Sequence, residues 1–92
     1  MKVVLNKCYG GFSLSKQAYE MLGLKWDRFG YEYCNYGERT NPKLVRVVEA
    51  LGDDASGELA DLRVVEIPDD VEWEIDDYDG YEEVIAPRKV YG

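Results

Sequence analysis

NKCYGGFSLS, residues 6–15, joins an apolar strand to a helix through a pair of glycines. The apolar run Val3–Leu5 before it predicts a buried strand. After it, Ser15 is placed to cap a helix over Lys16–Leu22, and Gly23 is placed to end that helix. Paired glycines permit positive φ and the close approach of another backbone or of a ligand. We therefore predict a binding turn between the first strand and the first helix.

A second helix is predicted in the middle of the chain. Asn41 is placed as its N-cap, Pro42 as its first residue and Gly52 as its end. Apolar residues recur on one face at helical spacing, so we expect that face to be buried against strands. The expected core consists of Leu44, Val47, Val48, Leu51, Val4, Leu62, Val64 and Trp73.

The sequence pattern of the C-terminal half predicts strands. Residues 60–67 read as a strand with apolar residues on both faces, and residues 71–86 as a hairpin around a type I′ turn at Asp79-Gly80. That turn predicts the pairs Tyr78 with Tyr81, Asp77 with Glu82, Asp76 with Glu83, Ile75 with Val84 and Trp73 with Ala86. We predict a single α+β domain over residues 1–92. A small antiparallel or mixed sheet of the N-terminal strand, strand 60–67 and hairpin 71–86 would carry both helices on one face.

Charge is divided unevenly along the chain. Residues 1–52 hold eight basic and five acidic residues, whereas residues 53–83 hold fourteen acids and one arginine. The net charge of −8 therefore predicts one mildly basic and one strongly acidic surface. It argues against direct nucleic-acid binding by the molecule as a whole. No apolar run of membrane-spanning length and no signal peptide is present, so we expect a cytoplasmic protein without membrane contact.

Residue types with catalytic or metal-binding chemistry are scarce. Histidine is absent, which removes the usual general base near neutral pH and the commonest zinc ligand. Cys8 and Cys34 could pair, but a reducing cytosol favours two free thiols. The glycine pair lacks the remaining residues of a phosphate loop or a dinucleotide fingerprint. We expect no enzyme, no bound metal and no cofactor.

The candidate ligand site lies around the glycine turn. Helix N-termini offer free N–H groups to an anion, and a guanidinium and a hydroxyl precede the second helix. The candidate ligand-binding residues are Asn6, Cys8, Tyr9, Gly10, Gly11, Phe12, Ser13, Ser15, Arg39, Thr40 and Asn41. The candidate stacking residues for a planar ligand are Tyr31, Tyr33 and Tyr36. Two alternatives stay open: Arg39 pairs with one of the many acids, and the tyrosines merely cover a small core.

The acidic hairpin is the alternative binding surface. Its segment Glu72–Glu83 could dock a basic protein surface or mimic nucleic acid. The candidate partner-binding residues are Asp76, Asp77, Asp79, Glu82 and Glu83. Directly opposed acids repel across a ladder, so they are expected on a solvated edge or against a cation or basic partner.

Most of the chain is similar to a family of small uncharacterised proteins common in bacteriophages and their bacterial hosts. The similar segments are KVVLNKCYGGFSLS (2–15), RTNP with the helix after it (39–51), ASG (55–57) and the stretch from VEIPDDV to YDG (65–80). Members often end in a tail with His-Arg and tryptophan, whereas this chain ends in PRKVYG (87–92). The resemblance implies no settled activity.

Small accessory phage proteins mostly act by binding, and in the host cytoplasm. By that analogy we expect a non-enzymatic protein that sequesters a small anionic, nucleotide-like ligand at the glycine turn. Inhibition of a host protein through the acidic hairpin is the alternative, and self-association into a homo-oligomer stays open.

Overall fold

The computed structural model describes all residues, 1–92, and has an α+β fold, as predicted. Its α-helices, strands and two 3-10 helices (η) are, in chain order, β1 (Lys2–Asn6), α1 (Lys16–Leu22), η1 (Tyr36–Glu38), α2 (Pro42–Leu51), η2 (Gly52–Ala55), β2 (Leu62–Glu66), β3 (Glu74–Tyr78), β4 (Tyr81–Ala86) and β5 (Lys89–Tyr91). The strand predicted over 60–67 is therefore shorter, and β5 lies in a tail for which no element was predicted.

Both predicted α-helices form with the predicted caps. The Ser15 hydroxyl oxygen accepts a hydrogen bond from the Ala18 N–H at 3.1 Å, and the Asn41 side-chain oxygen accepts one from the Lys43 N–H at 2.9 Å. These bonds satisfy N–H groups that have no partner inside a first helical turn. Both helices thus begin at residues that the local sequence specifies.

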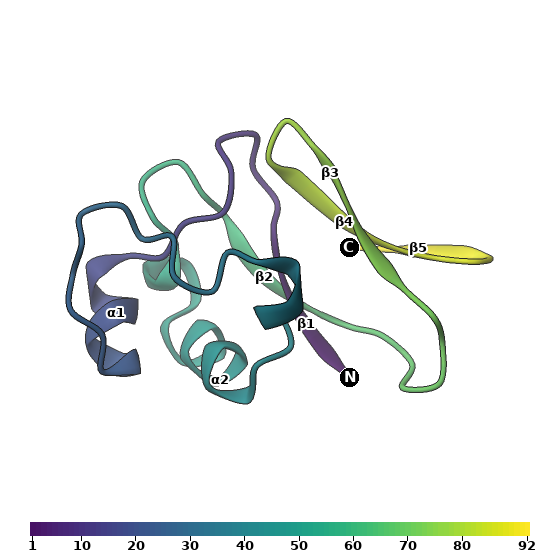
Figure 1. Cartoon of the computed structure of the whole chain (residues 1–92), viewed down its shortest axis with the longest axis horizontal. Helices are drawn as coiled ribbons and strands as arrows, with labels where there is room; N and C mark the ends of the chain where they lie inside the picture. Colours follow the sequence, from purple (N-terminus) through teal and green to yellow (C-terminus); the bar gives the residue numbers. More distant parts are fainter.

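The strands form two sheets rather than the predicted single sheet (Figure 1). β1 pairs with β2, and β3, β4 and β5 form a separate sheet, with every pairing antiparallel. The single-sheet prediction is wrong because the side chains of Arg39 and Glu82, not a strand, occupy the second edge of β1. α2 contacts β1 and β2, whereas α1 contacts α2 and η2, so packing of both helices on one sheet face is not confirmed.

β1 and β2 form a middle layer between the helices and the three-stranded sheet (Figure 1). Val4 belongs to the core cluster that contains the helices, and Val64 packs against it. Val3 belongs to a second cluster, which contains Val84 of β4, and Val65 packs against that one. Successive strand residues point to opposite faces, so a strand covered on both sides needs a continuous apolar run. This explains the unbroken apolar stretch that starts the chain.

Most of the predicted core is confirmed. Leu44, Val47, Val48, Val4 and Leu62 are buried in one cluster, and Leu51 and Val64 are partly buried against it. Trp73 was wrongly placed in this core. It packs on the second cluster instead, because the hairpin covers the opposite face of β1.

The hairpin has the predicted register between Ile75 and Val84 and at the three pairs nearer the turn. Asp79 and Gly80 have φ of 53° and 91°, and a type I′ turn needs positive φ at both positions. Trp73 does not pair with Ala86 as predicted, because β3 begins only at Glu74.

Leu44 provides a test of the core. It is completely buried, so Leu44→Ala should lower the free energy of unfolding by about 2–5 kcal/mol through lost burial and the cavity left behind. Leu59 is 67% exposed, and Leu59→Ala should change that energy by less than about 0.5 kcal/mol. Urea denaturation of both variants measures the difference, and equal effects would show that α2 does not face the core.

Candidate functional site

Arg39 and Glu82 form a buried ion pair between β1 and β4. Their side chains are 1% and 2% exposed. Nη1 of Arg39 donates to Oε1 of Glu82 at 2.5 Å, and Nη2 donates to Oε2 at 2.8 Å. This two-bond geometry is the strongest arrangement of an arginine with a carboxylate.

The remaining donors of Arg39 are also taken by the protein. Nε and Nη2 donate to the Cys34 carbonyl oxygen at 3.2 and 2.8 Å, and Nη1 donates to the Val4 carbonyl oxygen at 3.3 Å. The Phe12 ring lies 4.0 Å from the guanidinium carbon. Arg39 therefore offers no donor to an anionic ligand, and the alternative prediction, pairing with an acid, is confirmed.

Glu82 was predicted on an exposed partner-binding surface, and this placement is wrong. Its Oε1 accepts a further hydrogen bond from the Asn6 N–H at 2.8 Å, so the carboxylate is held against the edge of β1. The sequence did contain a signal for this burial. Glu82 lies two positions before Val84 on the same strand, so both side chains must share the face that packs on β1.

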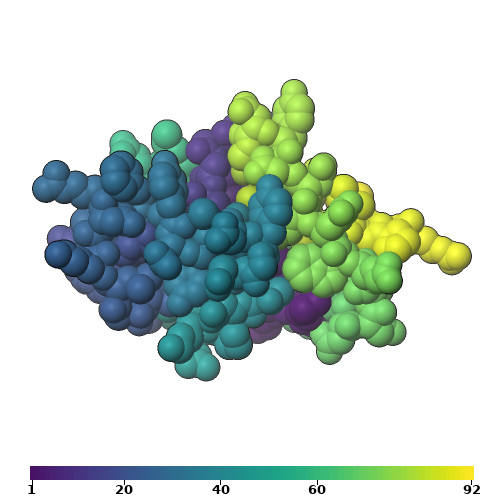
Figure 2. Space-filling model, in the orientation of Figure 1, coloured from purple at the N-terminus to yellow at the C-terminus, as the bar shows by residue number.

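Asn6 fastens the glycine turn to the tip of the hairpin. Its amide nitrogen donates to the carbonyl oxygens of Cys8 and Gly80, each at 2.7 Å, and its side-chain oxygen accepts from the Asp61 N–H at 2.9 Å. Figure 2 shows the purple N-terminal turn directly beside the yellow-green hairpin tip. Asn6 is buried and fully bonded within the protein, so we give it a structural role.

A hollow of about 240 Å³ opens where three loops meet, within residues 10–14, 26–31 and 57–59. Of the predicted ligand-binding residues, Gly10, Gly11, Phe12 and Ser13 line it, and of the predicted stacking residues only Tyr31 does. The other lining side chains include Trp26, Arg28, Phe29 and Glu58, which were not predicted as site residues from the sequence. The loop after α1 carries most of them.

Close backbone packing holds these loops together. A Cβ atom on Gly10 would lie 2.2 Å from the Leu59 carbonyl oxygen, and one on Gly57 would lie 2.1 Å from the Ser13 hydroxyl oxygen. Both distances are far inside van der Waals contact. At Gly10 the atom met is backbone, so only glycine fits there, whereas at Gly57 the Ser13 side chain would have to move. The close approach predicted for the glycine turn therefore occurs, but at Gly10 the approaching group is another loop.

The surface of the hollow is aromatic, with one positive and one negative charge. Phe29 and Tyr31 are 66% and 59% exposed, and their rings stack with centroids 6.0 Å apart. Arg28 forms no ion pair, and Glu58 is the only lining acid. In the lining loop, the backbone N–H groups of residues 10–13 donate to no group of the protein, and the Gly11 nitrogen lies against Gly80 of the hairpin tip. The hollow thus offers rings and one guanidinium, and one of its lining loops has unbonded N–H groups.

Asp27 orders the loop that carries Phe29 and Tyr31. Its Oδ1 accepts hydrogen bonds from the Phe29 and Gly30 N–H groups at 2.8 and 2.9 Å, and its Oδ2 accepts one from the Tyr19 hydroxyl at 3.1 Å. Bonds from the Gly30 and Phe29 N–H groups lower the pKa of the Asp27 carboxyl. An aspartate whose side chain accepts a hydrogen bond from the backbone N–H two residues later is a known turn signal. This turn was not predicted from the sequence.

The remaining predicted ligand residues lie away from the hollow. Ser15 and Asn41 cap the helices, and the Ser15 hydroxyl also donates to the Asp54 carbonyl oxygen at 2.5 Å. Thr40 lines a separate shallow depression beside Lys2. Cys8 and Cys34 are half-buried free thiols, as expected. The structure therefore does not bring the two helix N-termini into one site.

Two predicted stacking residues have other surroundings. Tyr33 packs against the helix-containing core cluster, which agrees with the alternative that aromatics cover a core. The Tyr36 ring lies 5.6 Å from the Arg39 guanidinium carbon, and its hydroxyl donates to Asp77 at 3.2 Å. Burial, and then the negative charge of Asp77, raise the pKa of the Tyr36 hydroxyl. Tyr36 covers the buried ion pair.

The chain matches no family model, and no curated protein or solved structure matches it. The resemblance to a bacteriophage family thus stays a prediction. No three His, Cys, Asp or Glu side chains come together in a way that could hold a metal ion. No helix has both the length and the apolar character needed to cross a membrane.

Glu82→Gln tests the buried ion pair. It leaves the Arg39 charge buried without a counter-charge, so the free energy of unfolding should fall by about 3–5 kcal/mol. Asp76→Asn, on an exposed residue of the same hairpin, should change it by less than about 0.5 kcal/mol. Chemical denaturation measures both values. A small decrease in the free energy of unfolding for Glu82→Gln would show that the Glu82 carboxylate is exposed to water and not buried with Arg39.

Asp27 provides a pH test of the loop around the hollow. Because its pKa is lowered in the folded state, its hydrogen bonds stabilise the loop above the unfolded pKa of about 3.9. This stabilisation should be lost as the pH falls through the lower folded-state value. The amide resonances of Phe29 and Gly30 should therefore titrate with a midpoint below about 3.9 and not titrate in Asp27→Asn. A midpoint at or above the unfolded value would contradict these bonds.

Proposed function

We propose that this protein binds a small planar ligand with an anionic group, such as a nucleotide, in the hollow between the three loops. One observation carries the proposal: segments far apart in sequence bring exposed rings, an arginine without an acidic partner and unbonded N–H groups to the same hollow. Each group matches one part of such a ligand.

The rings match the planar part. Stacking of a base on an aromatic side chain contributes about 1–3 kcal/mol per base. Phe29 and Tyr31 are already stacked on one another with their rings exposed, so a ligand ring can extend the stack with little loss of side-chain freedom. Glu58 can accept hydrogen bonds from the N–H groups of a base.

The positive groups match the anionic part. With Arg39 fully bonded to Glu82 and to backbone, the proposed cation is Arg28. Arg28 has φ of 72°, a conformation that an arginine rarely adopts, and Asp27 stabilises this turn. The unbonded N–H groups of Gly10, Phe12 and Ser13 in the lining are the further donors proposed for a phosphate or carboxylate.

The proposed role is binding rather than catalysis. The lining holds one carboxylate and neither a cysteine nor a histidine, so it lacks a nucleophile with a partner base. Sequestration of a host molecule in the cytoplasm would follow if the bacteriophage resemblance holds. That part of the proposal rests on the sequence alone.

A thermal-shift screen against nucleotides and cyclic nucleotides tests the proposal, because a ligand that binds only the native state must raise the melting temperature. For any ligand found, Tyr31→Leu should weaken binding by about 1–3 kcal/mol. Arg28→Gly should weaken it about tenfold or more while leaving the fold intact, since glycine accepts the backbone conformation at this position.

Arg46 provides the matched control, because it is exposed on α2, forms no ion pair and lies outside the hollow. Arg46→Ala should leave the affinity in calorimetric titration unchanged. Equal losses of affinity for the Arg28 and Arg46 variants would show that the effect comes from the net charge of the protein and not from a contact in the hollow. A screen without any stabilising ligand would count against the hollow as a nucleotide site.

A further inference from the structure

The segment from the end of β2 to the hairpin tip carries many exposed acids, and most of them are unpaired. The exposed acids from β2 to the hairpin tip are Glu66, Asp69, Asp70, Glu72, Glu74, Asp76, Asp77 and Asp79. Only Asp69 forms an ion pair, with the N-terminal ammonium group. The other carboxylates have no basic partner within the chain, so this surface attracts positively charged molecules.

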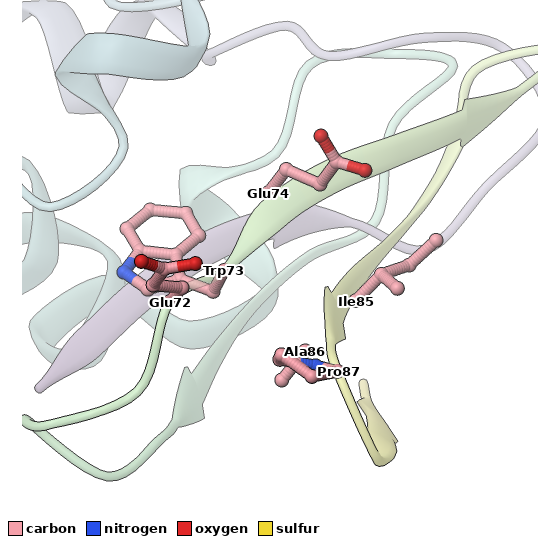
Figure 3. Close-up of a pocket in the computed structure, with 6 residues that line it drawn as sticks. All are labelled: Glu72, Trp73, Glu74, Ile85, Ala86 and Pro87. Carbon is pink, nitrogen blue, oxygen red and sulfur yellow. The ribbon is translucent and has the colours of Figure 1, made fainter.

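An open groove of about 420 Å³ lies beside these acids. Figure 3 shows Glu72, Trp73 and Glu74 on one side of it, with Ile85, Ala86 and Pro87 on the facing strand. Its apolar lining residues are Trp73, whose ring packs on the second cluster, and Ile85, Ala86 and Pro87 at the end of β4. The two glutamates supply its charge. No lining residue is shared with the loop hollow.

The strand beside the groove has a free edge. β3 is the outermost strand of its sheet, and beyond the ladder with β4 its backbone forms no hydrogen bond with the protein. Free N–H and C=O groups of an edge strand can pair with an extended segment of another chain. The groove does not lie at this free edge. It lies on the other side of β3, where β3 and β4 diverge beyond the Glu74–Ile85 pair.

We propose that the groove docks a basic segment of a partner protein, with an arginine side chain lying in the groove between the two glutamates and the end of β4. The aliphatic stem of an arginine packs on apolar surface while its charged end stays near water. Its planar guanidinium pairs with carboxylates, here those of Glu72 and Glu74, which line the groove. A lysine lacks the planar fork of donors that such a pairing with a carboxylate uses.

The charges of β3 disfavour a second copy of this chain as the occupant. Glu74, Asp76 and Asp77 lie along the strand, so pairing of β3 with another β3 would bring acids next to acids. Arg88 follows the groove residue Pro87 in sequence but forms no ion pair with either glutamate. The groove is therefore accessible to a basic segment from outside.

A single-tryptophan variant gives a direct measurement. The chain has two tryptophans, so Trp26→Phe leaves Trp73 as the only reporter, and it leaves the groove unchanged. The probe is a blocked Thr-Arg-Thr-Arg-Thr peptide, compared with the same peptide carrying citrulline, which keeps the shape but loses the charge. The arginine peptide should shift the Trp73 emission, and the citrulline peptide should not.

Matched charge variants separate the groove from the general acidity of the hairpin. Glu72→Gln with Glu74→Gln should weaken binding of the arginine peptide about tenfold or more, whereas Asp76→Asn with Asp79→Asn should weaken it less than about threefold. Equal losses for the two pairs would overturn the groove as the site, and so would an emission that millimolar arginine peptide leaves unchanged. Analytical ultracentrifugation tests self-association. A concentration-dependent dimer that is lost in the Glu72→Gln, Glu74→Gln variant and kept in the Asp76→Asn, Asp79→Asn variant would show that a second copy of the chain, and not a partner protein, occupies the groove.

Discussion

The second edge of β1 is the constraint on which the rest of the structure depends. β2 satisfies one edge of this buried strand, and the other edge needs partners because no water reaches it. The Val4 N–H donates to the Arg39 carbonyl oxygen at 2.9 Å, the Val4 carbonyl accepts from the Arg39 guanidinium, and the Asn6 N–H donates to Glu82. Main-chain and side-chain groups of the ion pair thus take the place of a neighbouring strand.

This arrangement positions the hairpin. Desolvation of two charges is costly and is offset only when the geometry is good and the remaining donors are bonded, and both conditions are met here. A shift of one residue in β4 would turn Glu82 outward and leave Arg39 without its counter-charge. The ion pair therefore specifies the face and register with which the hairpin packs on β1. Asn6 then joins the hairpin tip to the glycine turn, and through the turn to the hollow.

The local features of the fold could be predicted from the sequence, and the way its layers assemble could not. Caps, helical spacing and the Asp79-Gly80 turn act within a few residues, so both helices and the hairpin register were predicted correctly. The division into two sheets depends on contacts such as that between Arg39 and Glu82, which are 43 positions apart. Nothing in the neighbourhood of either residue indicates the other.

The same limit applies to the candidate site. The glycine turn and Tyr31 were predicted from residue type, and the structure places them together at the hollow. Arg28 and Phe29 were missed because their position depends on the Asp27 turn. Arg39 was selected for its charge beside a helix start, but burial decides how that charge is used. A formal charge in a sequence does not show whether water or a counter-charge surrounds it.

The late position of Glu82 in the chain has a consequence for the order of folding. β1 precedes β2 to β5 in the chain, yet its Asn6 N–H bonds to a carboxylate 76 positions later. A nascent chain that ends before residue 82 has an open strand edge and an arginine without a counter-ion, so the middle layer cannot close during most of translation. Contacts of such long range slow folding, because loop closure must precede them. The domain should therefore fold as one unit, after its C-terminal hairpin has left the ribosome.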